Sequence, residues 1–346
     1  MRAWRTHSWG QPEAVLQCDD IPVPDPGPGE LLVRTQALPL NLNDMERITG
    51  GNMMVTPELP LVPGMEVQGI VERGGEGVED WAGRRVVAMT KQATGGWAEF
   101  AICPAVSAFD VPDAIEGPEA GAFFFPFHLA GLGLWDRAEL QAGETVLIHA
   151  AAGGTGAAAV QIARQAGARV IATVGSEAKA AFAKRLGADV TVRYREEDFT
   201  EVVLAETAGR GVDVVFDGVG EAVLDGSMKS LAYHGRYVMI GFASDKSVAD
   251  APSLVPRRIA TGNFRLCGVL LAYAPEPLIP VMKKGMGWNF CPRSVGDGIH
   301  ARILEGFAAG QLNPVLGRTA DFDAIPREIQ ALFDRETMGR TVACWT

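Results

Sequence analysis

Between residues 145 and 271, short runs of apolar, β-branched residues alternate with longer runs in which apolar residues recur at helical spacing. The short runs predict buried strands and the longer runs predict amphipathic helices, one ending at residue 168 and another spanning 177–186. Such alternation is typical of right-handed βαβ units, whose parallel sheet is covered by helices on both faces. The pattern therefore predicts a doubly wound α/β domain. Its expected strands are 145–150, 169–174, 190–194, 212–218, 236–242 and 264–271.

The first 110 residues have a different texture, with many prolines and glycines between short β-prone runs. Turn clusters such as 74–77 separate these runs and predict an irregular, barrel-like β module. Its expected strands are 31–37, 68–71, 84–89 and 97–103. After residue 271 the regular order stops. The elements expected beyond 273–295 are a helix at 298–309, an amphipathic segment at 324–333 and a final strand at 341–345.

Length and charge limit the classes of function. At roughly 150 residues per domain, a chain of 346 residues forms about two domains. The chain has 31 Lys and Arg against 42 Asp and Glu, a net charge of −11. Its overall field repels polyanions, so we expect no nucleic-acid or membrane partner. The uncharged stretch 145–163 approaches membrane-spanning length, but its internal glycines indicate strand, turn and helix instead.

The cysteines are scattered, and none forms a C-x-x-C pair. This spacing excludes a cysteine-rich zinc site and is typical of reduced thiols. The N-terminal residues contain no apolar run of the kind that a signal peptide requires. We therefore expect a cytoplasmic protein. The five positions are Cys18, Cys103, Cys267, Cys291 and Cys344.

A glycine-rich turn follows the first strand of the α/β region, with the spacing A-x-G-x-x-G at Ala151, Gly153 and Gly156. Glycine leaves the backbone N–H groups at the start of the following helix open to a pyrophosphate, which the helix dipole also favours. The pattern alone is weak, but its position between a strand and a helix indicates a dinucleotide-binding turn. The residues expected to bind the cofactor there are Ala152, Gly153, Gly154, Thr155 and Gly156.

The end of the next strand selects the form of the nicotinamide cofactor, because a carboxylate there would hold a free ribose 2′-hydroxyl. This strand ends in Gly175 and Ser176, without a carboxylate at its tip. Ser176 and Lys179, with Tyr194 closing the following strand, predict a pocket for a 2′-phosphate and therefore NADP(H). Two alternatives stay open: Ser176 caps the helix while Lys179 is only solvated, or Glu177 binds the ribose.

The segment HAAAGGTGAAAVQIARQAGA (149–168) and the sequence that continues it to residue 199 resemble the quinone oxidoreductase branch of the medium-chain dehydrogenase/reductase superfamily. The resemblance extends upstream through LPLNLNDMERITGG and GGWAEFAICPA, and downstream through DVVFDGVG and RETMGRTVACW. It implies a Rossmann NADP-binding domain at 121–272 and a GroES-like, β-rich catalytic domain formed by 1–120 and 273–346. It also implies an active site in the cleft between these domains.

The same resemblance bears on metal binding. Zinc-dependent relatives carry G-H-E where this chain reads Gly64, Met65 and Glu66, and their upstream cysteine ligand falls in the segment 41–44. A thioether and an Asn/Asp segment do not form a catalytic zinc site, so we expect no metal. Without a Lewis acid to stabilise an alkoxide, hydride delivery to a quinone or an activated alkene is the better chemical fit.

The family correspondence also implies roles for individual residues. It places Asn41 and Asp44 in the cleft beside the nicotinamide, and Lys179, Tyr194 and Arg335 around the 2′-phosphate. Two alternatives remain for these residues. In the first, Asn41 and Asp44 only bond loop backbone, as Asx residues often do. In the second, Arg335 is only a charge at a helix end.

Further cofactor contacts are expected where two later strands end. Asp217 and Gly220 follow one strand, and Gly241 and Phe242, with the alanine after them, follow the next. The carboxyl edge of an open parallel sheet is where such folds bind ligands. We therefore expect these residues to lie near the cofactor.

The proton donor is not identifiable from the sequence. The apolar segment entering the α/β region, FFFPFHLAGLGLW, contains only His128 as a polar candidate, and it is either a core residue or a general acid. The other histidines show no pairing with Ser or Cys that would indicate a hydrolase. The stretch 275–294 is longer than in relatives, and either caps the substrate pocket or extends a subunit contact.

These observations favour a zinc-independent, NADPH-dependent oxidoreductase that transfers hydride to a quinone or an α,β-unsaturated carbonyl compound. The alternatives are an enoyl-thioester reductase with the same fold and a catalytically silent NADPH-binding protein. The partner is then a small-molecule substrate. We also expect a homodimer, because the apolar strand 265–271 should lie at a sheet edge and soluble proteins pair or cover such edges.

Overall fold

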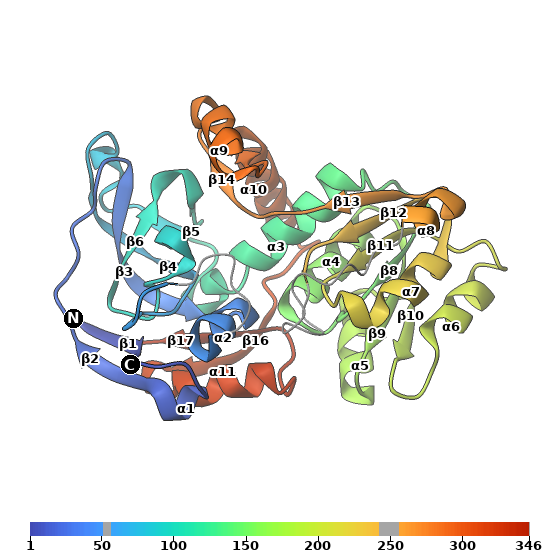
Figure 1. Cartoon of the computed structure of the whole chain (residues 1–346), viewed down its shortest axis with the longest axis horizontal. Coiled ribbons are helices and arrows are strands. Elements are labelled where there is room, and N and C mark those ends of the chain that lie inside the picture. Colours follow the sequence, from blue (N-terminus) through green and yellow to red (C-terminus); the bar gives the residue numbers. More distant parts are fainter. Residues whose placement is uncertain (51–56, 242–255, 346) are drawn as a thin grey trace. The chain divides into compact units, whose positions relative to one another are not determined.

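The computed structural model describes residues 1–50, 57–241 and 256–345, which form two compact units. The first, the β-rich unit, comprises Met1–Phe124, Ala272–Gly298 and Pro314–Thr346. The second, the Rossmann unit, comprises Phe125–Leu271 and Ile299–Asn313. Figure 1 labels the elements of both.

The Rossmann unit contains a six-stranded parallel sheet in the order β10-β9-β8-β11-β12-β13 (Figure 1). Its chain order reverses beside β8, so the ends of β8, β9 and β11 meet at the switch point where doubly wound folds bind ligands. The predicted α/β class is confirmed. The strands are β8 (Thr145–Ile148), β9 (Arg169–Val174), β10 (Val190–Arg193), β11 (Val212–Asp217), β12 (Leu231–Met239) and β13 (Arg265–Gly268).

Helices cover this sheet in pairs. Helices α4 and α5 pack against each other, as do α6 and α7. Val203 of α6 and Leu224 of α7 are buried in a core cluster with strand residues such as Leu147 and Val215. The Rossmann-unit helices are α3 (Phe124–Gly131), α4 (Gly154–Gln165), α5 (Glu177–Leu186), α6 (Phe199–Glu206), α7 (Glu221–Ser230) and α8 (Pro256–Gly262), and a π-helical turn (Leu132–Arg137) follows α3.

The stretch Ile299–Asn313 belongs to the Rossmann unit, whereas the predicted boundaries place all of 273–346 in the other domain. Phe307 packs edge-on against Phe127 of α3, with ring centroids 5.2 Å apart. Gln161 of α4 binds Asn313 through two hydrogen bonds of 3.1 and 2.9 Å. These contacts are long-range in sequence, and local pattern does not reveal them.

The β-rich unit is built around a seven-stranded sheet. Strand β3 is its centre, because it pairs with β17, β4 and β6. The sheet order is β16-β17-β3-β4-β5-β7, with β6 on β3, so the two chain ends share one sheet. The strands are β3 (Glu30–Pro39), β4 (Glu66–Gly74), β5 (Arg85–Met89), β6 (Phe100–Pro104), β7 (Ala108–Asp110), β16 (Leu316–Asp321) and β17 (Arg340–Cys344).

Several elements of the chain ends were absent from the sequence prediction. The helix expected at 298–309 begins earlier, and 273–295 contains its own helix and a short parallel ladder. The strand expected to reach residue 271 ends at Gly268. The remaining elements are β1 (Arg2–Thr6), α1 (Pro12–Val15), β2 (Leu16–Asp20), α2 (Leu42–Thr49), β14 (Tyr273–Ala274), α9 (Ile279–Met286), β15 (Cys291–Pro292), α10 (Arg293–Ala308) and α11 (Ile325–Phe333).

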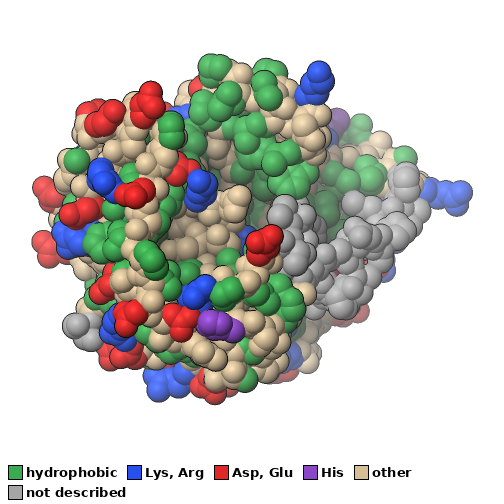
Figure 2. Space-filling model, turned by 60° about the vertical axis from the view of Figure 1, so that its left-hand side comes forward, with side chains coloured by type: hydrophobic (Ala, Val, Ile, Leu, Met, Phe, Trp, Pro, Cys, Tyr) green, Lys and Arg blue, Asp and Glu red, His purple; other side chains and the backbone are tan. Residues whose placement is uncertain are grey.

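The surface carries mixed charge. On the face that Figure 2 shows, Lys and Arg side chains stand among Asp and Glu side chains rather than in one continuous basic area. None of the helices in the described ranges combines the length and apolar character that crossing a bilayer requires.

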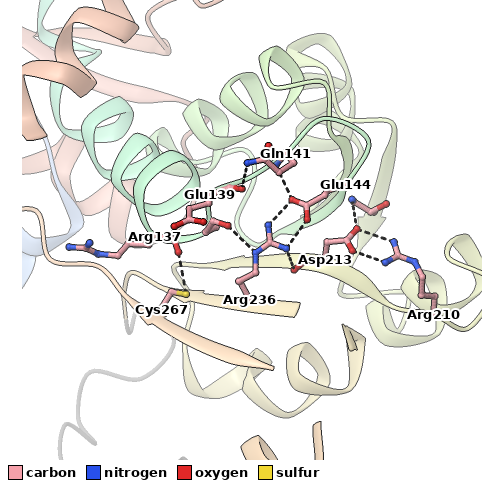
Figure 3. A network of polar contacts seen from close by, with 10 residues as sticks. Arg137, Glu139, Gln141, Glu144, Arg210, Asp213, Arg236 and Cys267 are labelled. Carbon is pink, nitrogen blue, oxygen red and sulfur yellow. Dashed lines mark hydrogen bonds and ion pairs between the residues drawn. The ribbon is translucent and has the colours of Figure 1, made fainter. Parts of the chain in front are cut away.

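A buried ion pair closes the Rossmann sheet at the end opposite the switch point (Figure 3). The Arg236 guanidinium on β12 donates to both carboxylate oxygens of Glu144, at 2.8 and 2.6 Å, and to the Ala138 carbonyl at 2.9 Å. Asp213 beside it accepts the Thr145 N–H at 2.8 Å. These hydrogen bonds tie β8, β11 and β12 to the segment that precedes β8.

Candidate functional site

The glycine-rich turn lies at the switch point of the Rossmann sheet. The Ala151 N–H donates to the Thr173 carbonyl of β9 at 3.1 Å, and the His149 N–H donates to the Phe216 carbonyl of β11 at 3.0 Å. Between them Ala150 adopts a left-handed φ of 51°. The turn is therefore held on both sides by the neighbouring strands.

Glycine is favoured at positions 153 and 156 of this turn for different reasons. A Cβ on Gly156 would lie 2.3 Å from the Ala150 carbonyl oxygen, so only glycine lets α4 pack on the turn. A Cβ on Gly153 would meet nothing closer than 3.4 Å, and Gly153 is exposed. Internal packing therefore does not require glycine at 153, whereas close approach of a ligand to the backbone would. With the unpaired N–H groups of the first turn of α4, formed by Gly154, Thr155 and Gly156, this surface fits a pyrophosphate.

Three of the predicted 2′-phosphate residues lie in the segments that follow β9 and β10, namely Ser176, Lys179 and Tyr194. A Cβ on Gly175 would lie 2.9 Å from the Tyr194 hydroxyl, so that phenol stands directly against the Gly175 backbone. Ser176 is the N-cap of α5, with its hydroxyl 3.4 Å from the Lys179 N–H, as one alternative proposed. Glu177 is largely exposed and lies 3.6 Å from Arg193 in an ion pair. Binding of a 2′-phosphate, and the alternative in which Glu177 binds the ribose, stay predictions.

Asp217 orders the turn that follows β11. Its carboxylate accepts the Val219 N–H at 2.7 Å, the Gly220 N–H at 3.1 Å and the Tyr237 hydroxyl at 2.5 Å. Burial raises the pKa of Asp217, and these donors oppose the rise. Asp217 is 1% exposed, so its carboxylate is buried beneath this turn, and its contact with the cofactor stays a prediction.

Close packing continues at the end of β12. A Cβ on Gly241 would lie 3.2 Å from the Gly218 carbonyl oxygen, so the segments after β11 and β12 approach each other. Phe242 and the alanine after it lie outside the described residues. Arg335 is exposed in the β-rich unit, where it follows α11 with a left-handed φ of 62°. Its contact with the 2′-phosphate stays a prediction.

Asn41 and Asp44 form the start of α2. Asp44 accepts the N–H groups of Asn41 and Met65, both at 3.0 Å, and is fully buried. Burial raises the pKa of Asp44 to about 6, while Arg47 and the Asn41 N–H act in the opposite direction. Asp44 therefore makes the contacts of the alternative prediction, in which its carboxylate bonds loop backbone. Contact of either residue with the nicotinamide stays a prediction.

Arg340 is the residue that sequence reasoning missed. Its guanidinium donates to the Asn41 side-chain oxygen at 2.7 Å and forms a buried ion pair with Glu66, which also accepts the Asn41 amide at 3.2 Å. Burial lowers the pKa of Arg340 to about 10, opposed by the charge of Asp44, so the group stays cationic at neutral pH. The three side chains connect α2, β4 and β17.

Met65 occupies the position at which zinc-dependent relatives carry a histidine ligand, and it packs in the core. Met65 is 4% exposed and belongs to the buried core. Within residues 1–50, 57–241 and 256–345, no three His, Cys, Asp or Glu side chains are grouped so that they could hold a metal ion. The metal-free state stays a prediction.

Two buried histidines have polar partners. His128 Nε2 lies 3.1 Å from Nδ1 of the buried His300. His149 Nε2 lies 2.8 Å from the Ser227 hydroxyl. That serine is 0% exposed, and burial lowers the pKa of His149 to about 3, so the pair is not an accessible nucleophile.

Comparison with known proteins places this geometry in a family. Residues 27–113 match the alcohol dehydrogenase GroES-like domain, and residues 154–284 match the family described as zinc-binding dehydrogenase. The quinone oxidoreductase of Sus scrofa is 31% identical over 294 residues, which cover 83% of this chain and 87% of that protein. The chain belongs to the quinone oxidoreductase branch of the medium-chain dehydrogenases/reductases. The resemblance noted from the sequence is confirmed.

Two further proteins of known identity are similar to this quinone oxidoreductase family member. A 2-haloacrylate reductase from Burkholderia sp is 35% identical over 254 residues, covering 70% of this chain and 73% of that protein. The Escherichia coli quinone oxidoreductase, solved in complex with NADPH, superposes with a TM-score of 0.84 at 27% identity. The superposition covers 99% of this chain and 100% of that structure. Both the GroES-like and the Rossmann part of the predicted fold are therefore confirmed.

Proposed function

We propose that this protein is an NADPH-dependent reductase that transfers hydride to a quinone or to the β-carbon of an α,β-unsaturated carbonyl compound. The observation that carries the proposal is the turn between β8 and α4, where Gly153 is exposed while Gly156 is packed against Ala150. The relatives support it: one is a quinone oxidoreductase, and another reduces a 2-haloacrylate, which is an α,β-unsaturated carboxylate.

The chemistry that NADPH supplies when bound is a hydride from C4 of its nicotinamide. The residues of this chain bind the cofactor and orient it. Backbone N–H groups at the start of α4 hold the pyrophosphate, while Ser176, Lys179 and Tyr194 hold the 2′-phosphate, with Arg335 as a further candidate. Asn41 and Asp44 act as positioning residues, because their side chains are bonded within the β-rich unit.

Steady-state consumption of NADPH tests this function. The purified protein is offered a quinone, an enone and an enoyl thioester in parallel. Turnover of the quinone or the enone supports the proposal. Turnover of the enoyl thioester alone indicates an enoyl-thioester reductase, and stoichiometric NADPH binding without turnover indicates a silent binding protein; either result overturns the proposal.

We expect the enzyme to work without zinc, because Met65, a thioether in the core, stands where zinc-dependent members of the superfamily are expected to carry a histidine ligand. Elemental analysis should find far less than one zinc per chain, and chelators should leave quinone reduction unchanged. One zinc per chain that is lost together with activity would show that this expectation is wrong.

We expect a homodimer that joins the sheets of two copies at β13, the edge strand of the Rossmann sheet. The Val269 N–H donates inward to the Met239 carbonyl at 3.1 Å, so the Gly268 N–H points away from β12. Gly268→Pro should therefore remove an outward donor and shift the mass in light scattering from two chains toward one.

Gly268→Ala is the matched control, because a Cβ there meets nothing within 4 Å and the N–H is kept. This variant should stay dimeric. A wild-type mass of one chain would refute the dimer.

The absence of disulfides among the five cysteines, all of which are described, supports a location in the reducing cytoplasm.

A further inference from the structure

Five polar side chains lie buried behind the loops of the dinucleotide site, each from a different segment of the Rossmann unit. None is more than 2% exposed, although a buried polar group is costly unless it is hydrogen-bonded. Their shared burial at one place calls for a physical reason. They are Thr173 (β9), His149 (after β8), Ser227 (α7), Tyr237 (β12) and Asp217 (β11).

Hydrogen bonds join these side chains into two groups. In the first, the Thr173 hydroxyl lies 3.0 Å from His149 Nδ1, and His149 Nε2 lies 2.8 Å from the Ser227 hydroxyl. In the second, the Tyr237 phenol donates to Asp217 at 2.5 Å. The edge of the Phe199 ring packs on the His149 imidazole, with centroids 4.9 Å apart.

The Asp217 carboxylate orders the second group. It accepts three donors, so the Tyr237 hydroxyl proton points to it. Burial, followed by the charge of Asp217, raises the pKa of Tyr237 and keeps that proton in place. In the first group, the two ring nitrogens of His149 each face a hydroxyl, that of Thr173 and that of Ser227.

Each group reaches a loop that the cofactor site uses. His149 directly precedes Ala150, the left-handed residue of the glycine-rich turn. Asp217 holds the N–H groups of Val219 and Gly220 in the turn after β11. Glycine and alanine in these loops have no polar side chains that could hold the loops in place. Residues packed beneath the loops therefore have to hold them.

We propose that these two hydrogen-bonded groups, one around His149 and one around Asp217, position the two loops for the dinucleotide without touching it. The proposal rests on the proposed function, because the cofactor site is assigned there. His149, Ser227 and Tyr237 are positioning residues in this view, and they take no part in hydride transfer. Removing one internal hydroxyl should therefore weaken cofactor binding while leaving the chemical step intact.

Tyr237→Phe tests this, because it removes only the hydroxyl that donates to Asp217. The Kd for NADPH, measured by its fluorescence without substrate, should rise about tenfold, and kcat at saturating NADPH should change less than about twofold. Tyr233→Phe is the matched control: it removes a hydroxyl from the same strand at a side chain that is 71% exposed, and its Kd should equal the wild-type value. An unchanged Kd for folded Tyr237→Phe overturns the proposal.

Amide hydrogen exchange gives a second readout that needs no cofactor. The Val219 and Gly220 N–H groups, which Asp217 accepts, should exchange faster in Tyr237→Phe than in wild type, and at the wild-type rate in Tyr233→Phe. Unchanged exchange in folded Tyr237→Phe overturns the proposal. If exchange rises as expected but wild-type protein binds no NADPH, the proposed function fails while the role of Tyr237 and Asp217 in holding this turn stands.

Discussion

Replacing Arg340 by Met lowers the free energy of unfolding by about 3 to 5 kcal/mol, because it leaves the Glu66 carboxylate buried without its cation. Glu66 is 1% exposed, so water cannot replace the lost partner. The loss also frees the Asn41 side-chain oxygen that Arg340 bonds at 2.7 Å. Urea denaturation of the full chain, with an unchanged m-value, measures the effect.

Two controls separate buried charge from general damage. Arg34 forms an ion pair with Glu72 in which both side chains are about half exposed, so Arg34→Met should cost about 0 to 1 kcal/mol. The double variant Arg340→Met with Glu66→Gln should recover part of the loss, because no uncompensated charge remains. Equal stability of Arg340→Met and wild type would contradict the importance of this pair.

Wild-type protein should bind NADPH at least tenfold more tightly than NADH, and Lys179→Ala should remove most of that preference. A charge-assisted hydrogen bond to the 2′-phosphate contributes roughly 1.5 to 3 kcal/mol, which corresponds to a tenfold or larger change in Kd. NADH lacks this phosphate, so its Kd should change less than about twofold. Fluorescence titration with each cofactor measures both constants.

Lys184→Ala serves as the control, since Lys184 is an exposed lysine in the last turn of the same helix, α5. Its removal should leave both constants unchanged. Equal wild-type affinity for the two cofactors would exclude the 2′-phosphate pocket. A parallel loss of NADPH and NADH affinity in Lys179→Ala would mean that the lysine acts on helix α5 rather than on the phosphate.

The sequence determined the features that depend on neighbouring residues. The strand at 169–174 and the helix at 177–186 coincide with β9 and α5, because hydrophobic periodicity and the Ser176 and Gly187 caps are local signals. The glycine-rich turn was located for the same reason, since a strand, a tight turn and a helix follow one another within about twenty residues.

Tertiary structure alone decided which buried polar groups are paired. Arg340 is 299 residues from Asn41 and 274 residues from Glu66, and Ser227 is 78 residues from His149. Periodicity can place such residues on a strand or a helix, but a buried charge or imidazole is stable only where the fold brings a partner to it. The position of Asp44 and the placement of Ile299–Asn313 in the Rossmann unit depend on the same kind of long-range contact. The sequence thus determined the scaffold and the phosphate turn, and the packing of distant segments decided what holds them in place.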